Sequence, residues 1–388
     1  MFATLAVVMV VALVGSLPAA RSGIRLPLVL GELLAGIVVG ISGLGWVDAS
    51  EPTLDAVAQV GFALVMFVAG THVPIRDARL RPALGRGIGR AALVGALAVP
   101  AGIGLAQLFD APHPALFAVL LSSSSAALVL PIVDTAGIDG PELLPLLVQV
   151  AVADTVCIVA LPLVIDPPRA LHAGLGAVAV IACAAVVFVA LRQLERTGMR
   201  RRVHHVSKDR KLAIELRVSL AVLFGLGALA VWTHVSVMLA GFALGLAVAA
   251  VGEPRRLAGQ LFAVTEGFFA PVFYVWIGAS IDVRVLWEEP SRIGLGLALG
   301  AAAIAVHLVP RATGQPFALG ALSATQLGIP LAAVAIGIAG GLLSRADAAA
   351  LVLGALVTIV AAAIAAAVAT PRRPHTAEPK PPPDTPRP

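Results

Sequence analysis

The chain alternates between long apolar runs and short polar segments over almost its whole length. Apolar runs of about 18 residues or more, separated by turn-forming and charged residues, are typical of transmembrane helices. The pattern predicts thirteen membrane-spanning helices, near residues 2–20, 26–42, 54–74, 88–109, 114–135, 142–165, 173–191, 212–232, 235–251, 262–286, 292–310, 317–341 and 348–369.

The first apolar run has two possible interpretations. The first run could instead belong to a signal peptide, since small residues follow it, but no lysine or arginine precedes it as a cleaved signal normally requires. We therefore expect residues 2–20 to form the first helix. The runs near 26–42 and 235–251 are short and rich in glycine, which leaves the count of thirteen spans open by one.

Basic residues predict how the chain is oriented. With the loops taken alternately, 22 of the 27 lysine and arginine residues fall on one side and four on the other, with Arg217 inside a span. Because basic loops stay in the cytoplasm, we expect a multi-pass protein of the cell (inner or plasma) membrane, with its N-terminus outside and its C-terminus cytoplasmic. The net charge of +5 thus reflects topology and gives no reason to expect a nucleic-acid partner.

Composition agrees with a membrane protein, with 59% hydrophobic and only 13% charged residues, against about 25% charged in soluble domains. The membrane domain is expected to cover residues 1–370. Residues 371–388 are rich in proline and are predicted to be a disordered cytoplasmic tail. The basic segment 192–211 is interpreted as a connector between two halves, with a regulatory site as the alternative.

Asp154 is the most informative polar residue. It lies twelve residues from both Glu142 and Asp166, so it is placed about 18 Å from either end of its helix, near the bilayer midplane. A lone charged carboxylate there costs on the order of 3 kcal/mol or more. It must pair, be hydrated, bind a cation or take up a proton, and a functional role is favoured over a structural one.

A run of serines interrupts the fifth span: Ser122, Ser123, Ser124 and Ser125. Irregular backbone within a membrane occurs only where it lines a cavity or is buried in protein. The second half carries a matching interruption, with Ser323, Thr325, Gln326, Gly328 and Pro330. The helix after it has Thr358 near its centre, where the first half has Asp154. Paired interruptions of this kind point to a transport site, although serines can also bond to their own helix.

Three other embedded residues stay open between a site role and a structural one. Gln149 lies just over a turn before Asp154 on a similar face, Glu32 is near a span start, and His307 is close to the predicted inner face. The chain has no HExxH, no paired-aspartate motif for prenyl diphosphates and no GxSxG, so we expect a transporter rather than an enzyme. No cofactor or resident metal is expected.

Five blocks of the sequence are informative when taken together: PLVLGELLAGIVVGISGLGW, VGFALVMFVAGTHVPI, AVLLSSSSAALVLPIVDTAGI, VADTVCIVALPLVI and FFAPVFYVWIGASID. They resemble the monovalent cation:proton antiporter family, within the sodium/proton exchanger superfamily, and its Kef-type membrane domain. The resemblance implies an all-α polytopic fold of thirteen helices, built from inverted repeats with two crossing broken helices. It also implies a homodimer, with a mobile core near 88–165 and 292–369 and the remaining helices as dimerisation scaffold.

In this resemblance Asp154 matches the family's essential aspartate, which binds a cation and protons in turn. Hydroxyls of Ser123, Ser124 and Thr155, and carbonyls of the broken helices, are expected to complete an oxygen shell for Na⁺ or K⁺. Gln149 is also expected at the ion-binding site. Supporting roles are expected for seven residues: Ser122, Ser125, Thr325, Gln326, His307, Glu32 and Thr358.

The chain departs from the family pattern in three places. Ala153 stands where the family usually has Asp, Asn or Gln, so a single titrating carboxylate remains and one-for-one, electroneutral exchange is expected. The span that usually carries a lysine has only His307, and Thr71 and His72 follow Gly70 where Gly-x-Glu is common. These departures leave the coupling cation open. A sodium-coupled symporter of an organic solute is the alternative, although it would be expected to carry more cationic residues.

Overall fold

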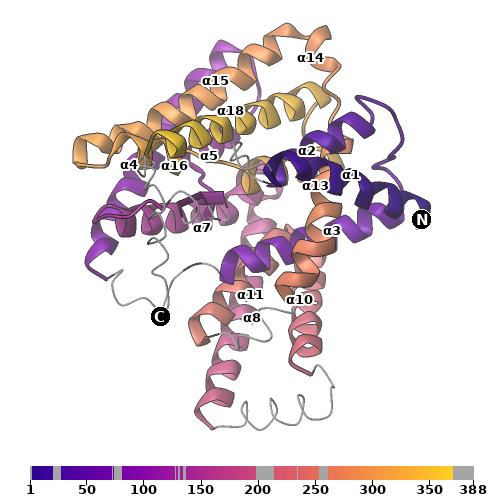
Figure 1. The fold of residues 1–388 in the computed structure, drawn as a ribbon. Coiled ribbons are helices and arrows are strands. Elements are labelled where there is room, and N and C mark those ends of the chain that lie inside the picture. Colours follow the sequence, from indigo (N-terminus) through magenta and orange to yellow (C-terminus); the bar gives the residue numbers. More distant parts are fainter. Residues whose placement is uncertain are drawn as a thin grey trace, which may run out of the picture.

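The computed structural model describes residues 2–20, 28–71, 73, 81–126, 128–129, 132–133, 137–197, 214–233, 235–252 and 261–369. The predicted tail 371–388, residues 198–211 of the basic segment, and His72 lie outside the described residues. Every regular element in the described part of the chain is helical, which confirms the all-α class (Figure 1).

The helices follow the apolar runs of the sequence. In chain order they are α1 (Phe2–Ala20), α2 (Leu28–Val39), α3 (Pro52–Thr71), α4 (Arg81–Leu108), α5 (Pro114–Ser122), α7 (Leu143–Ile165), α8 (Ala170–Arg196), α10 (Ile214–Trp232), α11 (Val237–Val251), α13 (Ala270–Ser280), α14 (Val285–Glu288), α15 (Pro290–Leu308), α16 (Phe317–Ser323), α17 (Gly328–Ala339) and α18 (Arg345–Ala369). Shorter 3₁₀ segments are η2 (Pro167–Arg169) and η4 (Val309–Thr313), and a π-helical turn, η3 (Thr265–Phe269), leads into α13.

Eight helical stretches among the described residues are long and apolar enough to cross a membrane: Pro52–Thr71, Arg81–Leu108, Leu143–Ile165, Pro167–Arg196, Leu261–Glu288, Pro290–Thr313, Phe317–Ala339 and Arg345–Val368. Four shorter apolar helices accompany them: Phe2–Leu17, Leu28–Val39, Leu216–Trp232 and Val237–Val251. A multi-pass helical protein is therefore confirmed, while the count of thirteen spans stays a prediction.

The start of α4 differs from the sequence expectation. The helix begins at Arg81 rather than near residue 88, so the segment RPALGRGIGR is helical despite its charges. Two of these arginines, Arg86 and Arg90, form ion pairs with Glu142. Only Arg90 is buried, and its ion pair offsets part of the cost of burying the guanidinium group.

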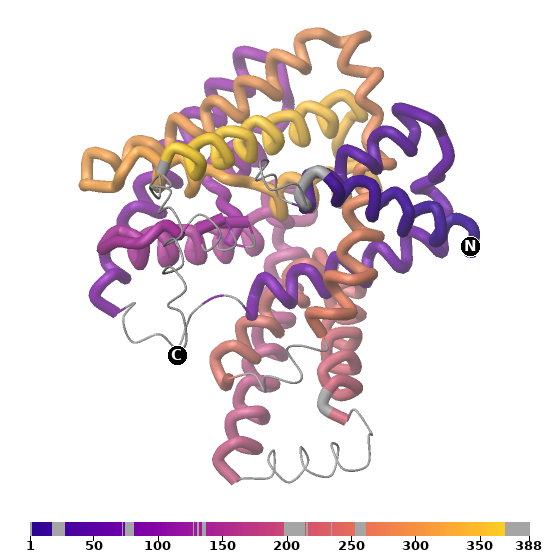
Figure 2. The backbone as a smooth tube through the Cα atoms, in the orientation of Figure 1, coloured from indigo at the N-terminus to yellow at the C-terminus, as the bar shows by residue number. Residues whose placement is uncertain are grey.

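The helices pack in two groups. One contains α1, α2, α3, α8, α10, α11 and α13, and the other contains α4, α5, α7, α15, α16, α17 and α18. Figure 1 shows α8, α10 and α11 below the second group, and in Figure 2 the tube of α18 runs beside α15. The second group holds both interrupted helices and Asp154, so it positions the candidate site.

Small residues bring α3 and α11 together. At Gly241 and Gly245 of α11, an added Cβ would overlap the carbonyl oxygens of Ala63 and Phe67 of α3. Within a membrane, close packing of this kind is a main source of helix association, because lipid offers no hydrophobic drive between helices. This seam therefore packs α3 and α11 tightly together within the first group.

Candidate functional site

The serine run ends α5. The helix begins with Pro114 in its first turn and stops at Ser122, and Ser123 is extended, with φ −74° and ψ 153°. The hydroxyls of Ser122 and Ser123 donate to the carbonyls of Val119 and Leu120, at 3.1 and 2.8 Å. These bonds satisfy carbonyl groups that a helix end otherwise leaves unpaired.

Ser124 and Ser125 continue the break that Ser123 begins. Ser124 is 2% exposed, and its hydroxyl has no hydrogen-bond partner among the described residues. Ser125 accepts the amide of Val129 through its carbonyl, and helical geometry resumes at Ala126. A buried hydroxyl without a partner is uncommon in a folded protein, so Ser124 is open to bind a ligand.

Asp154 lies on α7 beside this break and is 7% exposed. Its Oδ2 accepts the amide of Ala126 at 3.3 Å, where the chain becomes helical again. No other hydrogen bond and no ion pair to the Asp154 carboxylate is found among the described residues. The carboxylate therefore faces a backbone donor rather than a side-chain cation.

A second break separates α16 from α17 at residues 324–327. The hydroxyls of Ser323 and Thr325 donate to carbonyls of the preceding turn, as those of Ser122 and Ser123 do in α5. The backbone amide of Gln326 donates to Oγ1 of Thr358 on α18 at 3.1 Å. In both breaks, an amide of the interrupted segment thus bonds to a polar side chain of the helix that follows.

The two breaks are in direct contact. Nε2 of Gln326 donates to the carbonyl of Leu120, in the last turn of α5, at 2.6 Å. On the other side, the Cys157 thiol of α7 lies 3.5 Å from both Ser122 Oγ and the Val119 carbonyl. Segments from α7 and from the second break therefore converge on the end of α5.

Cys157 contacts the end of α5 beside the candidate site, and the sequence reasoning did not single it out. It follows Asp154 by three residues, so the two lie on one face of α7. This spacing was a usable signal, but cysteine in an apolar run usually behaves as a small hydrophobic residue and attracts no attention.

Other predicted site residues have their hydrogen bonds elsewhere. The Thr155 hydroxyl donates to Ala151 of its own helix, and Nδ1 of the buried His307 pairs with Ala303 on α15. Glu32 is buried on α2, in the other helix group. None of these contacts joins them to the Asp154 carboxylate, and their assigned roles stay predictions.

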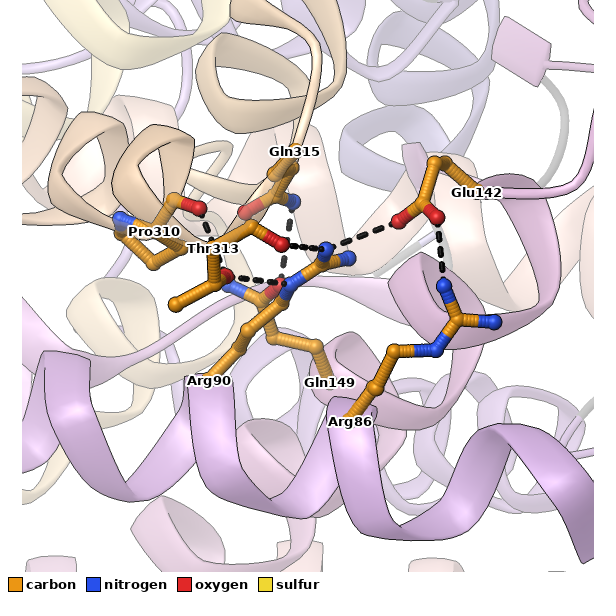
Figure 3. Close-up of polar contacts among 7 residues, drawn as sticks. All are labelled: Arg86, Arg90, Glu142, Gln149, Pro310, Thr313 and Gln315. Atoms are coloured by element: carbon orange, nitrogen blue, oxygen red, sulfur yellow. Dashed lines mark hydrogen bonds and ion pairs between the residues drawn. The ribbon is translucent and has the colours of Figure 1, made fainter.

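A buried arginine organises the end of α7 that is remote from Asp166 (Figure 3). Arg90 of α4 is 2% exposed, and its Nη2 lies 2.8 Å from Oε2 of Glu142, the residue that precedes α7. Its Nε and Nη2 also donate to the hydroxyl and the carbonyl of Thr313, both at 3.1 Å. The exposed Arg86 pairs with Oε1 of Glu142 at 2.6 Å. Together these bonds fasten α4, α7 and the connection between α15 and α16.

Gln149 belongs to the neighbouring part of this arrangement. Gln315 donates its amide to Oε1 of Gln149 at 3.0 Å, and Gln149 donates in turn to Ser323 at 3.4 Å (Figure 3 shows the first contact). Gln149 therefore links α7 to α16, and the second break begins directly after Ser323. Its predicted contact with the ion at Asp154 stays a prediction.

Comparison with known proteins places these features in a family. A family model described as sodium/hydrogen exchanger, transmembrane, matches residues 7–369. The chain belongs to this family. The resemblance inferred from the sequence blocks is confirmed, and the family is one of transporters rather than enzymes.

Curated relatives agree at modest identity. The glutathione-regulated potassium-efflux system protein KefC of Salmonella paratyphi B is 28% identical over 302 residues, covering 74% of this chain and 47% of the relative. The Bacillus subtilis protein named "Putative Na(+)/H(+) antiporter YjbQ" is 22% identical over 303 residues, covering 74% of this chain and 48% of the relative. The chain spans about half the length of these curated relatives.

Proposed function

We propose that this protein exchanges a monovalent cation, Na⁺ or K⁺, for protons across the cell membrane by alternating access. Asp154 binds the cation and the proton in competition. The observation that carries the proposal is its placement: a buried carboxylate beside a broken helix, bonded to one backbone amide and to no side-chain cation among the described residues. Membership of the sodium/hydrogen exchanger family and the names of the relatives support the same activity.

The chemistry follows from competition for one charge. A carboxylate in a low-dielectric site must be neutralised, by a proton or by a cation, before the site changes its access from one side of the membrane to the other. Hydroxyl oxygens, including the unpartnered Oγ of Ser124, suit a hard monovalent cation, and a dehydrated ion needs several of them. Because Ala153 supplies no second carboxylate, each cycle exchanges one cation for one proton and moves no net charge.

The architecture implied by the family also enters as part of the proposal. The paired bonds Ala126–Asp154 and Gln326–Thr358 support two inverted repeats that cross at their breaks. We assign the helix group with α4, α5, α7 and α15–α18 to the moving core, and the other group to the scaffold of a homodimer. Thirteen spans with the N-terminus outside complete the arrangement.

Proteoliposomes holding a pH-sensitive dye test the proposal. On addition of Na⁺, K⁺ or Li⁺, the wild-type protein should move protons, and Asp154→Asn should reduce this flux to that of protein-free liposomes. Asp166→Asn, at the end of the same helix, is the matched control and should retain exchange.

A voltage-sensitive dye in the same vesicles should report no potential during exchange. A cation-dependent potential would contradict the one-for-one ratio. The absence of proton movement with every cation, in correctly inserted protein, would overturn the antiporter proposal and favour a sodium-coupled carrier of organic solutes.

A further inference from the structure

Among the described residues, Gln326 makes the only side-chain hydrogen bond that joins the two breaks. Its Nε2 is 2.6 Å from the carbonyl of Leu120, a residue 206 positions away in sequence. Its own backbone amide is held by Thr358 on α18. The residue is buried, and hydrogen bonds hold both its backbone amide and its side-chain amide.

Gln326 contacts the C-terminal end of α5, where the last carbonyl groups need hydrogen-bond donors from outside the helix. Carbonyl groups in the last turn of a helix carry a partial negative charge and lack partners within the helix. Positive side chains are a common way to stabilise them. Here the Leu120 carbonyl accepts instead from the amide and hydroxyl of Ser123 and from Gln326, and all three donors are neutral.

The absence of a cation at this point matters for Asp154. An ammonium or guanidinium group at the break would attract the carboxylate and compete with the transported ion. Among the described residues, no lysine, arginine or histidine bonds to Asp154, and His307 is paired with its own helix. A neutral amide satisfies the helix end without occupying the carboxylate.

We propose that Gln326 is the positioning residue of the ion site: its amide ties the two breaks together with a neutral donor and so leaves the charge of Asp154 to the transported cation. This inference rests on the proposed function. It predicts that Gln326 controls the affinity for the cation more than the maximal rate, because the bridge sets the ion-binding geometry before transport begins.

Two variants test the role. Gln326→Leu keeps the size of the side chain and removes the donor, and we expect the KM for the cation to rise about tenfold, equivalent to about 1.4 kcal/mol. Gln326→Glu introduces a carboxyl group that changes its protonation state with pH. While the introduced carboxyl group is protonated it donates to the Leu120 carbonyl, and once ionised it repels that oxygen. Its exchange should therefore match wild type at low pH and fall earlier than wild type as pH rises.

Trp276→Phe is the matched control. The Trp276 indole also donates to a distant backbone carbonyl, that of Ala49 at 3.0 Å, but it lies in the other helix group. We expect this variant to lose one comparable hydrogen bond with KM and pH profile unchanged. Such a result separates a positioning role from a general loss of stability.

The experiments can fail in two distinguishable ways, one for the role of Gln326 and one for the proposed cation:proton exchange. Cation-induced thermal stabilisation of each purified variant gives a binding measurement that does not depend on transport. If wild type exchanges ions and Asp154→Asn does not, a Gln326→Leu protein with wild-type KM, and a Gln326→Glu protein with the wild-type pH profile, overturn the inference alone. If wild type shows neither exchange nor cation-induced stabilisation, both proposals fail.

Discussion

Two adjacent serines in the first break, Ser123 and Ser124, have different roles. The Ser123 hydroxyl closes the end of α5 on the Leu120 carbonyl, whereas the Ser124 hydroxyl is buried without a partner among the described residues. A satisfied hydroxyl contributes to folding, and an unsatisfied one is a cost that persists when it serves a ligand. The sequence predicted both as ion ligands but could not separate them, since the difference depends on which way each side chain turns.

Ser124→Ala and Ser123→Ala should therefore behave in opposite ways. Removing the unpartnered, buried Ser124 hydroxyl takes away a desolvation cost, so it should raise the free energy of unfolding by about 1–3 kcal/mol while weakening cation affinity about fivefold. Removing the Ser123 hydroxyl should cost about 1 kcal/mol of stability. Thermal unfolding and cation-dependent proton flux measure the two effects, and unchanged flux kinetics in Ser124→Ala would contradict its role as a ligand.

At the scale of helices, the sequence predicted where most helices lie along the chain, but it did not predict which residues of different helices contact one another. The long apolar runs located α3, α7 and α15, and the polar interruptions located both breaks. The start of α4 was placed too late, because the arginines in its first turns look like loop residues when their partner is unseen. Contacts between helices, such as Gln149 of α7 with Ser323 of α16, depend on packing that no local pattern encodes.

The seam between α3 and α11 offers a test at this scale. Gly241→Ala should lower the free energy of unfolding by about 1–3 kcal/mol, since its Cβ would overlap the Ala63 carbonyl. Gly225→Ala on α10 is the control, because no atom lies within 4 Å of an added Cβ there. Thermal unfolding of detergent-purified protein should show a loss for Gly241→Ala alone, and equal stability of the two variants would argue against a rigid seam.

Across the whole molecule, Arg90 ties the first half of the chain to the second. It reaches from α4 to Glu142 and to Thr313, which lies 223 residues further along. A buried ion pair adds little net stability over apolar residues, but breaking it leaves an uncompensated charge. In the sequence, Arg90 was only one of the basic residues that predict orientation. Its burial could not be predicted, because it depends on how the helices pack against one another.

Glu142→Gln should destabilise the protein by about 1–3 kcal/mol, less than for a fully buried pair because the Glu142 side chain is 20% exposed. The double variant Arg90→Met with Glu142→Gln should recover part of this loss, since the stranded charge is gone. Thermal unfolding of both variants checks the prediction. A double variant less stable than the single one would show that Arg90 acts through Thr313 instead.

The pairing of Ala153 with a lone Asp154 sets a thermodynamic limit for the proposed exchanger. When one cation is traded for one proton, the membrane voltage drops out of the driving force and only the two concentration ratios remain. At equilibrium the cation ratio equals the proton ratio, about tenfold for each pH unit across the membrane, or about 1.4 kcal/mol. A cell using this protein would extrude its cation only as far as its pH gradient allows, whatever its electrical potential.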